Sequence, residues 1–267
     1  MSHRGNMPKV LITGAARGIG RAIAQTLCGH EYRVTGTYYP FDENDDKLAG
    51  VEYVPLDFNS EESIDSCIQK VGDTDILVNN VGQSQIGPVE ELSLEKIRQD
   101  FQVNLFGMIQ LTQAFIPGMR ERNSGMIINI GSLAGKFSVP FQSIYVATKS
   151  ALAGFSWALR NEVVDYGIKV VVIEPNDIKT EIKPAICTDE DSVYKDCIQK
   201  MMAAREKKMA KSPGPEIVAQ KIVKILKKKK PKPFYAVGGM GPLIVFLKRF
   251  FPDKTIEYLL RKNYHLN

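Results

Sequence analysis

The stretch from Val10 to Gly20 reads VLITGAARGIG, and it decides the expected fold. A short apolar run meets closely spaced glycines, and Ile19, Ile23 and Leu27 then recur at four-residue steps. This order predicts a strand, a tight turn and a helix. Because glycines let backbone approach a ligand and the first N–H groups of a helix attract phosphate, the turn indicates a pyrophosphate site. A strand-to-helix turn that binds nothing is the alternative.

Short apolar runs alternate with helical patterns along the rest of the chain. Strands are predicted at residues 10–13, 33–38, 51–55, 76–79, 126–130, 170–174 and 234–237, and helices at 19–28, 60–71, 93–120, 144–165 and 217–226. This alternation predicts right-handed crossovers and a mainly parallel sheet with helices on both faces. We therefore expect a single α/β domain over residues 1–267, with its site at the carboxyl ends of the strands.

Composition excludes several classes of protein. The 267 residues are 44% hydrophobic and 24% charged, which is ordinary for a globular domain. No run approaches the roughly 20 apolar residues of a membrane helix, and residues 1–6 form an expected polar leader rather than a secretory signal. The four cysteines show no metal or CxxC spacing, so we expect no metal and a cytoplasmic location. Three histidines, two of them near the termini, leave a Ser-His-Asp hydrolase without an obvious base.

The net charge of +5 is unevenly distributed. Lys224, residues 227–230 and Lys232 form one dense basic segment. A solvated helix end and attraction to an anionic membrane surface are both open interpretations. We expect no nucleic-acid partner, since no recognition motif accompanies the charge.

Three side chains that follow the fifth predicted strand indicate acid/base chemistry. Ser132 follows the fifth strand, and Tyr145 and Lys149 stand four residues apart on one face of a helix. A tyrosine pKa near about 10 is too high for a base at neutrality, and a neighbouring ammonium favours the phenolate. Ser132 can hold a substrate oxygen beside the Tyr145 hydroxyl. A Tyr–Lys pair alone is typical of a solvated helix face, but the glycine turn and Ser132 favour catalysis.

Together with the turn Asn79-Asn80-Val81-Gly82, these residues resemble the short-chain dehydrogenase/reductase family, most closely its hydroxysteroid- and retinol-type members. The resemblance covers roughly residues 9–180. It implies a doubly wound, Rossmann-like domain with a seven-stranded sheet, a hydride transferred between NAD(P) and an alcohol or ketone, and a homodimer or homotetramer. Two departures stand out: Val81 replaces an alanine, and Asn176 replaces a glycine after Pro175. We expect the Asn176 turn to survive, because asparagine tolerates left-handed backbone.

The resemblance also completes the expected site. It adds Asn104 to the catalytic set of Ser132, Tyr145 and Lys149, with a water held at Asn104 linking Lys149 to solvent. It places Asp57 and Phe58 near the adenine, and Pro175, Ile178 and Thr180 near the nicotinamide. The expected cofactor-binding residues are Gly14, Arg17, Gly18, Ile19, Gly20, Tyr38, Asp57, Phe58, Asn80, Val81, Gly82, Tyr145, Lys149, Pro175, Ile178 and Thr180.

The end of the second strand predicts the preferred cofactor. NAD-binding enzymes usually carry a carboxylate there for the ribose 2′-OH, but residues 35–40 read TGTYYP and no acid appears before Asp42. Arg17 can meet a 2′-phosphate through a charge-assisted bond. We therefore expect NADP(H) in preference to NAD(H), although a solvated loop arginine remains the alternative.

The substrate side indicates a bulky lipophilic alcohol or ketone, such as a hydroxysteroid. Phe137, Val139, Phe141 and Ile86 are candidates for an apolar pocket, with ordinary core packing as the alternative. Residues 183–212 are the expected substrate lid. The C-terminal extension, residues 233–267, is expected to be helical. It mixes apolar and basic residues and could cover the pocket, seal a dimer or touch a membrane. A 3-oxoacyl thioester reductase and a non-catalytic nucleotide-binding regulator are the alternative functions.

Overall fold

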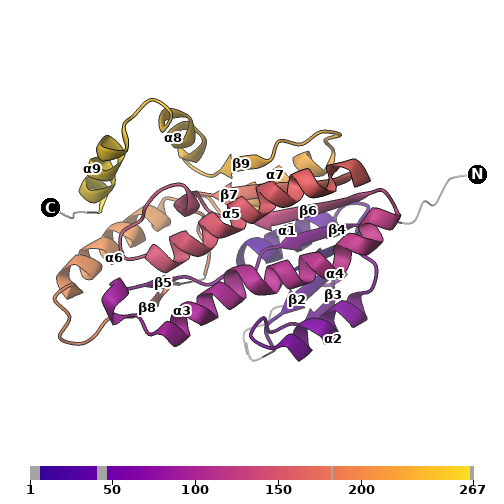
Figure 1. Ribbon diagram of the computed structural model, residues 1–267, viewed down its shortest axis with the longest axis horizontal. Coiled ribbons are helices and arrows are strands. Elements are labelled where there is room, and N and C mark those ends of the chain that lie inside the picture. Colours follow the sequence, from indigo (N-terminus) through magenta and orange to yellow (C-terminus); the bar gives the residue numbers. More distant parts are fainter. Residues whose placement is uncertain (1–6, 41–46, 182, 265–267) are drawn as a thin grey trace, which may run out of the picture.

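The computed structural model describes residues 7–40, 47–181 and 183–264, and it contains a seven-stranded parallel sheet in the order β3-β2-β1-β4-β6-β7-β9 (Figure 1). The expected leader and Asp42 lie outside these ranges. The strands are β1 Lys9–Ile12, β2 Arg33–Tyr38, β3 Glu52–Pro55, β4 Ile76–Asn79, β6 Gly125–Ile130, β7 Ile168–Pro175 and β9 Phe234–Val237. The expected fold class is therefore confirmed, and the strand order reverses between β1 and β4, where such sheets bind ligands.

Helices cover both faces of the sheet. Their bounds are α1 Gly18–Cys28, α2 Glu61–Val71, α3 Leu94–Phe101, α4 Gly107–Glu121, α5 Ser143–Val163, α6 Lys195–Ala210, α7 Glu216–Leu226, α8 Gly241–Leu247 and α9 Asp253–Asn263. One apolar core lies between the sheet and helices α1 and α7, and the other between the sheet and helices α2, α4 and α5. In β1, Leu11 faces the second core while Val10 and Ile12 face the first, as the alternation of side chains along a strand requires.

Local chemistry sets several of the element boundaries. Ser60 begins α2 as predicted, because its side chain accepts a hydrogen bond from the Ser63 N–H. The expected helix over residues 93–120 is interrupted instead by a π-helical segment, Gln102–Phe106, between α3 and α4. Such segments are common at functional sites, and this one contains Asn104.

One small feature beside the main sheet was not predicted from the sequence. The short strands β5 (Gln85–Ile86) and β8 (Ala185–Ile186) pair in parallel beside the main sheet. The C-terminal extension is helical, as expected, and forms α8 and α9, which Figure 1 shows beyond the end of β9. The basic residues 227–230 lie in an exposed connection between α7 and β9, whereas α8 follows β9. No helix in the described ranges has the length and hydropathy needed to cross a membrane.

Candidate active site

The glycine turn forms a wall made of backbone at the carboxyl end of β1. Gly14 and Gly18 have φ values of +67° and +56°, a region that side chains disfavour. A Cβ at Gly14 would lie 2.9 Å from the Val81 Cγ2, and a Cβ at Gly20 would lie 2.1 Å from the Gly14 carbonyl oxygen. Nothing larger than glycine fits, and the N-terminus of α1 opens onto the turn. This shape suits the dinucleotide pyrophosphate that the sequence predicts.

Asn80 fixes this turn against the end of β4. Its side-chain amide donates to the carbonyl oxygens of Thr13 and Gly14, at 2.9 and 3.2 Å. The Asn80 N–H donates in turn to the Thr13 hydroxyl at 2.8 Å. The two strand ends at the sheet's reversal point are therefore held together.

Asn79 lies inside the protein instead. Its amide donates to the side chains of Asn129 and Thr112, at 2.9 and 3.2 Å, and it is fully buried. Asn79 thereby joins β4 to β6 and α4, so its contribution is to hold the framework under the site.

Asn104 converges with Gly82 and Lys149 beneath the site. The Asn104 Oδ1 accepts a hydrogen bond from the Gln83 N–H at 2.8 Å, and its Nδ2 donates to the Gln83 carbonyl at 2.9 Å. A Cβ at Gly82 would lie 3.2 Å from the Lys149 Nζ and 3.4 Å from the Asn104 Oδ1. The fully buried Asn104 side chain therefore fixes the backbone that follows Gly82.

Ser132, Tyr145 and Lys149 come together as their spacing predicts. Ser132 follows β6 and opens a short 3₁₀ turn, where its hydroxyl accepts a hydrogen bond from the Ala134 N–H at 3.1 Å and interacts with Tyr145 on α5. The Ser150 hydroxyl donates to the Gly135 carbonyl at 2.8 Å, which holds the turn against α5. The Lys149 Nζ donates to the Ile130 carbonyl at 3.0 Å and lies 5.9 Å from the centre of the Tyr145 ring.

Burial controls the proton affinities of this group. It raises the pKa of Tyr145 above its usual value, while the Ser132 hydrogen bond and the positive charge of Arg205 act in the opposite direction. Burial also lowers the pKa of Lys149 from 10.5 to about 8. The sequence predicted a lowered Tyr145 pKa with Lys149 as the cause. The structure differs because desolvation of the phenol outweighs the opposing interactions, and because the Lys149 ammonium is directed at the Ile130 carbonyl.

The ribose end of the site carries a cation that sequence reasoning missed. The Lys47 ammonium lies 3.8 Å from the centre of the Tyr38 ring, at the carboxyl end of β2. Arg17 is exposed at the residue that precedes α1. Lys47 has no signal in the sequence because it follows the acid-rich segment DENDD at residues 42–46, and only the fold brings it over Tyr38.

Several expected cofactor contacts have buried side chains. The Phe58 ring packs so closely on Gly107 that a Cβ there would lie 2.2 Å from the ring. Ile178 is in the core, against Gly238. These two residues can offer only backbone to a ligand. Asp57, in contrast, remains at the end of β3, where its Oδ1 accepts hydrogen bonds from Asn59. Pro175 ends β7, and Thr180 is half-buried in the loop beyond it.

Asn176 does not adopt the left-handed backbone that its place in the family pattern suggested. The positive φ, +45°, falls on Asp177 instead. A Cβ at Gly241 would lie 3.0 Å from the Asn176 Cβ and 2.8 Å from the Leu133 Cδ1. The Asn176 side chain thus packs against the start of the C-terminal extension, next to the residue that follows Ser132.

Helix α6 closes the other side of the site. Ile198 and Met201 are buried in a small cluster with Ile86, and Phe141 and Tyr264 pack against it. Ile86 and Phe141, two of the expected pocket residues, therefore lie beneath α6. Phe141 has a left-handed φ of +58°, which is rare for an aromatic residue and is a form of strain that clusters at functional sites.

Two polar contacts anchor the segments that surround this cluster. The Lys208 ammonium pairs with Asp177 at 2.7 Å, which ties the end of α6 to the loop after β7. The Lys248 ammonium, just after α8, donates to the Lys136 carbonyl. The expected lid and the extension are thus both attached beside the Ser132 turn.

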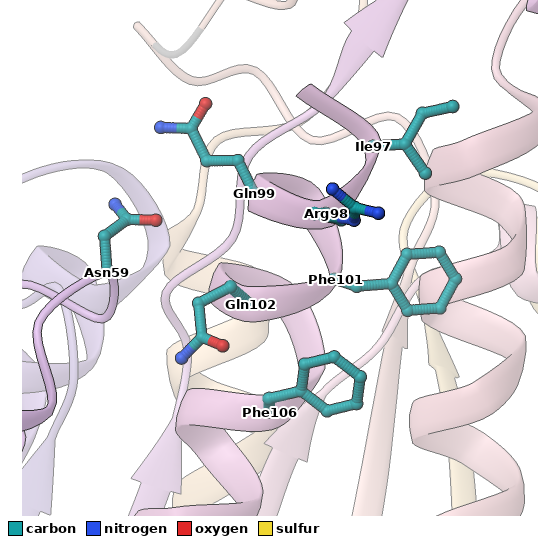
Figure 2. Close-up of a pocket in the computed structure, with 7 residues that line it drawn as sticks. All are labelled: Asn59, Ile97, Arg98, Gln99, Phe101, Gln102 and Phe106. Carbon is teal, nitrogen blue, oxygen red and sulfur yellow. The ribbon is translucent and has the colours of Figure 1, made fainter. Parts of the chain in front are cut away.

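A separate hollow of about 530 Å³ lies on the outer side of α3. Figure 2 shows Ile97, Phe101 and Phe106 along one side and Asn59 across from Gln102. None of the expected catalytic residues lines it. This hollow is therefore distinct from the convergence of Ser132, Tyr145 and Lys149.

Comparison with known proteins supports the same assignment. The sequence profile of short chain dehydrogenases matches residues 8–191. A 3-ketodihydrosphingosine reductase of Bacteroides thetaiotaomicron is 32% identical, over 94% of this chain and 96% of its own length. Retinol dehydrogenase 8 of Homo sapiens is 30% identical, over 83% of this chain and 78% of its own length. The crystal structure of a short-chain dehydrogenase from Streptomyces avermitilis is 32% identical with a TM-score of 0.80, and covers 96% of this chain and 97% of its own. The chain belongs to the short-chain dehydrogenase family, whose members are oxidoreductases acting on CH–OH groups.

Proposed function

We propose that this protein transfers a hydride between NADP(H) and a bulky lipophilic secondary alcohol or ketone, such as a hydroxysteroid. The observation that carries the proposal is the meeting of Ser132, Tyr145 and Lys149 at the same sheet edge as the glycine turn. The turn suits a dinucleotide because its glycines pack too closely for a Cβ, so the turn presents backbone rather than side chains. A bound nicotinamide would supply or accept the hydride at this edge.

The proposed roles follow from the contacts of each side chain. Tyr145 donates a proton to the substrate oxygen in reduction and accepts one in oxidation. Ser132, hydrogen-bonded to the Tyr145 hydroxyl, holds the substrate oxygen in line with it. Lys149 carries positive charge beneath the Tyr145 ring and binds the ribose of the nicotinamide. Asn104 holds the backbone at Gln83 and, with a water, connects Lys149 to solvent.

Loss of the proton donor tests this mechanism and the alternative of a non-catalytic regulator. Tyr145→Phe should abolish turnover and leave the Kd for NADPH nearly unchanged, because only the hydroxyl is removed. The measurements are NADPH oxidation under saturating ketone and fluorescence titration of NADPH. Substantial turnover in this variant would refute the mechanism. Tight NADPH binding by a wild-type protein that reduces no ketone would favour the regulator.

The preference for NADP(H) is supported by two cations around the 2′-phosphate position, Arg17 and Lys47. Each charge-assisted contact to phosphate is worth about 1.5–3 kcal/mol. Arg17→Ala and Lys47→Ala should therefore lower kcat/KM for NADPH and leave that for NADH nearly unchanged. A wild-type preference for NADH that neither substitution alters would contradict the proposal.

The lipophilic substrate is supported by the apolar wall beneath α6 and by the extension beside Leu133. The similarity to a reductase of 3-ketodihydrosphingosine and to a retinol dehydrogenase points in the same direction. A 3-oxoacyl thioester reductase is the second candidate. A screen of NADPH oxidation and NADP⁺ reduction over steroids, bile acids, retinoids, 3-oxoacyl thioesters and sugars separates them. Activity confined to thioesters or sugars would overturn the substrate assignment.

We expect a homodimer or homotetramer that packs through the outer face of α4 and α5. Trp157 on α5 is 58% exposed, and Phe106, next to the hollow of Figure 2, is 51% exposed. A second copy of the chain would cover such side chains. Light scattering on wild type and Trp157→Lys tests the face. A wild-type monomer at micromolar concentration would contradict it.

Contact with an anionic membrane is assigned to a different surface, the extension at α8 and α9. Leu243, Phe246 and Phe250 are more than half exposed there, and Lys248 and Arg249 lie among them. Apolar side chains interspersed with cations suit a charged bilayer. Co-sedimentation with phosphatidylserine vesicles should exceed that with phosphatidylcholine and fall in Phe250→Ser. Equal sedimentation of wild type and variant would count against this contact.

A further inference from the structure

The face of helix α6 that packs against the protein carries a cation, Arg205, beyond its buried apolar residues. Ile198 and Met201 are 3% and 1% exposed, and they lie three residues apart on the face that covers Ile86. Arg205 follows Met201 by four residues, so it continues the same face one helical turn further on. Arg205 is half-buried, whereas its neighbours Glu206 and Lys207 are exposed. The guanidinium is therefore directed to the protein side of the helix.

Arg205 faces the catalytic hydroxyl and the C-terminal extension. Burial raises the pKa of Tyr145 and that of Tyr264, which packs against the cluster under α6, and the positive charge of Arg205 opposes the rise at both residues. Tyr145 and Tyr264, from different parts of the chain, thus both interact electrostatically with the Arg205 guanidinium. The site is also held in place, because Lys208, less than one turn further along α6, pairs with Asp177 after β7.

Within the described ranges, no carboxylate forms an ion pair with Arg205. The nearby acid, Asp177, is paired with Lys208. Withdrawing a charge from water is costly unless the charge gains a partner. A half-buried guanidinium without a counter-ion, next to a catalytic tyrosine, is arranged to receive a negative group from a ligand.

We propose that Arg205 is a specificity-determining residue that binds an anionic oxygen group of the substrate, a carboxylate or a phosphate. The inference rests on the proposed reductase function and narrows its substrate class. The wall of Ile86, Phe141 and Met201 would take the apolar body of the substrate, and Arg205 its acidic group. Among the lipophilic alcohols and ketones proposed above, the substrate is therefore one that also carries an acidic group.

The test compares matched ketones on three variants. The probes are 7-oxooctanoate, its methyl ester and 7-oxooctyl phosphate, together with homologues that have fewer or more methylenes. The variants are Arg205→Met, which keeps an apolar stem, Arg205→Lys, which keeps the charge, and Lys207→Met, which removes a charge from the exposed face. Steady-state kinetics with saturating NADPH give KM and kcat separately. Calorimetric titration of octanoate and octanol into the enzyme–NADP⁺ complex gives a readout that needs no turnover.

We expect Arg205→Met to lower kcat/KM for the acid by about tenfold to hundredfold, the usual value of a charge-assisted hydrogen bond. The selective loss should appear in the KM for the acid, and Arg205→Lys should recover part of it. Because the Arg205 charge also acts on Tyr145, any change in kcat should be the same for the acid and its methyl ester, and the KM for the ester should not change. Lys207→Met should behave as wild type. An effect on the carboxylate alone or on the phosphate alone supports the proposal and identifies the anion.

Three results would overturn it. The kcat/KM for the ester and that for the acid could fall equally in Arg205→Met. Octanoate could also bind wild type no more tightly than octanol does. Arg205→Met could also weaken the binding of NADP⁺ as much as the binding of the acid, which would make the cofactor phosphate the partner of Arg205. If no ketone is reduced but octanoate binding depends on Arg205, the proposed function fails while this inference stands.

Discussion

Replacement of Lys149 by methionine should stabilise the protein while abolishing its activity. Lys149 is 4% exposed, and its ammonium donates to the Ile130 carbonyl at 3.0 Å. Within the described ranges no carboxylate pairs with it. Burial lowers its pKa from 10.5 to about 8. The folded state therefore bears the cost of a desolvated charge that the proposed reaction needs.

The size of the effect follows from the pKa shift. Each pKa unit corresponds to about 1.4 kcal/mol, so the charged Lys149 costs about 3 kcal/mol at pH 7. Methionine fills a similar volume without charge, but it leaves the Ile130 carbonyl without its donor, which costs about 1–3 kcal/mol. The free energy of unfolding of Lys149→Met should then exceed that of wild type by about 1 kcal/mol at pH 7.

The pH dependence distinguishes this cause from general repacking. The folded-state pKa lies below the unfolded one, so the unfolded state binds more protons between pH 8 and 10.5. Wild-type stability should therefore rise with pH in that window, relative to the variant, by at most about 1.4 kcal/mol per pH unit. Urea unfolding of both proteins from pH 7 to 10, followed by circular dichroism, should show the advantage of the variant disappear. Lys207→Met, at an exposed site, is the control.

The reasoning would be refuted if the difference in stability between wild type and Lys149→Met were the same at pH 7 and pH 10. A variant less stable than wild type at pH 7, with no change on raising the pH, would likewise show that burial of the ammonium costs nothing. Turnover in Lys149→Met close to that of wild type would remove the lysine from the proposed mechanism.

Three further substitutions test the framework of the site. Gly20→Ala should weaken NADPH binding by about tenfold or more, because a Cβ would lie 2.1 Å from the Gly14 carbonyl oxygen; a fluorescence titration equal to wild type would contradict the backbone wall. Lys136→Met leaves the carboxylate of Glu174, 2% exposed, without its partner and should cost about 3 kcal/mol at pH 8. Because burial already raises the pKa of Glu174, the loss should shrink at pH 5, and a loss independent of pH would argue against the buried pair. Lys208→Met should speed proteolysis within α6 and raise the substrate KM by releasing Asp177; an unchanged cleavage rate would show that the pair does not hold α6.

The sequence predicted the elements whose signals are local. The strand at Arg33–Tyr38 and that at Ile76–Asn79 have the bounds that the apolar runs predict, and Ser60 precedes α2 as its capping chemistry requires. The helical stretch expected over residues 93–120 is present, but residues 102–106 in its middle are π-helical. Its periodicity continues through residues 102–106, and the π-helical segment there is accompanied by long-range hydrogen bonds from Asn104 to Gln83 and Thr148 and from Gln102 to Phe58.

What the sequence by itself determined is the sheet, the glycine turn and the convergence of Ser132, Tyr145 and Lys149, the expected catalytic residues. Strand order and helix spacing place these residues at one edge, whatever the rest of the chain does. Only the tertiary structure decided the direction of the Tyr145 pKa and the position of Arg205 beside it, since both depend on burial and charge from segments distant in sequence. Periodicity reports how a residue faces its own helix or strand, whereas desolvation and Coulomb interactions depend on everything packed around it.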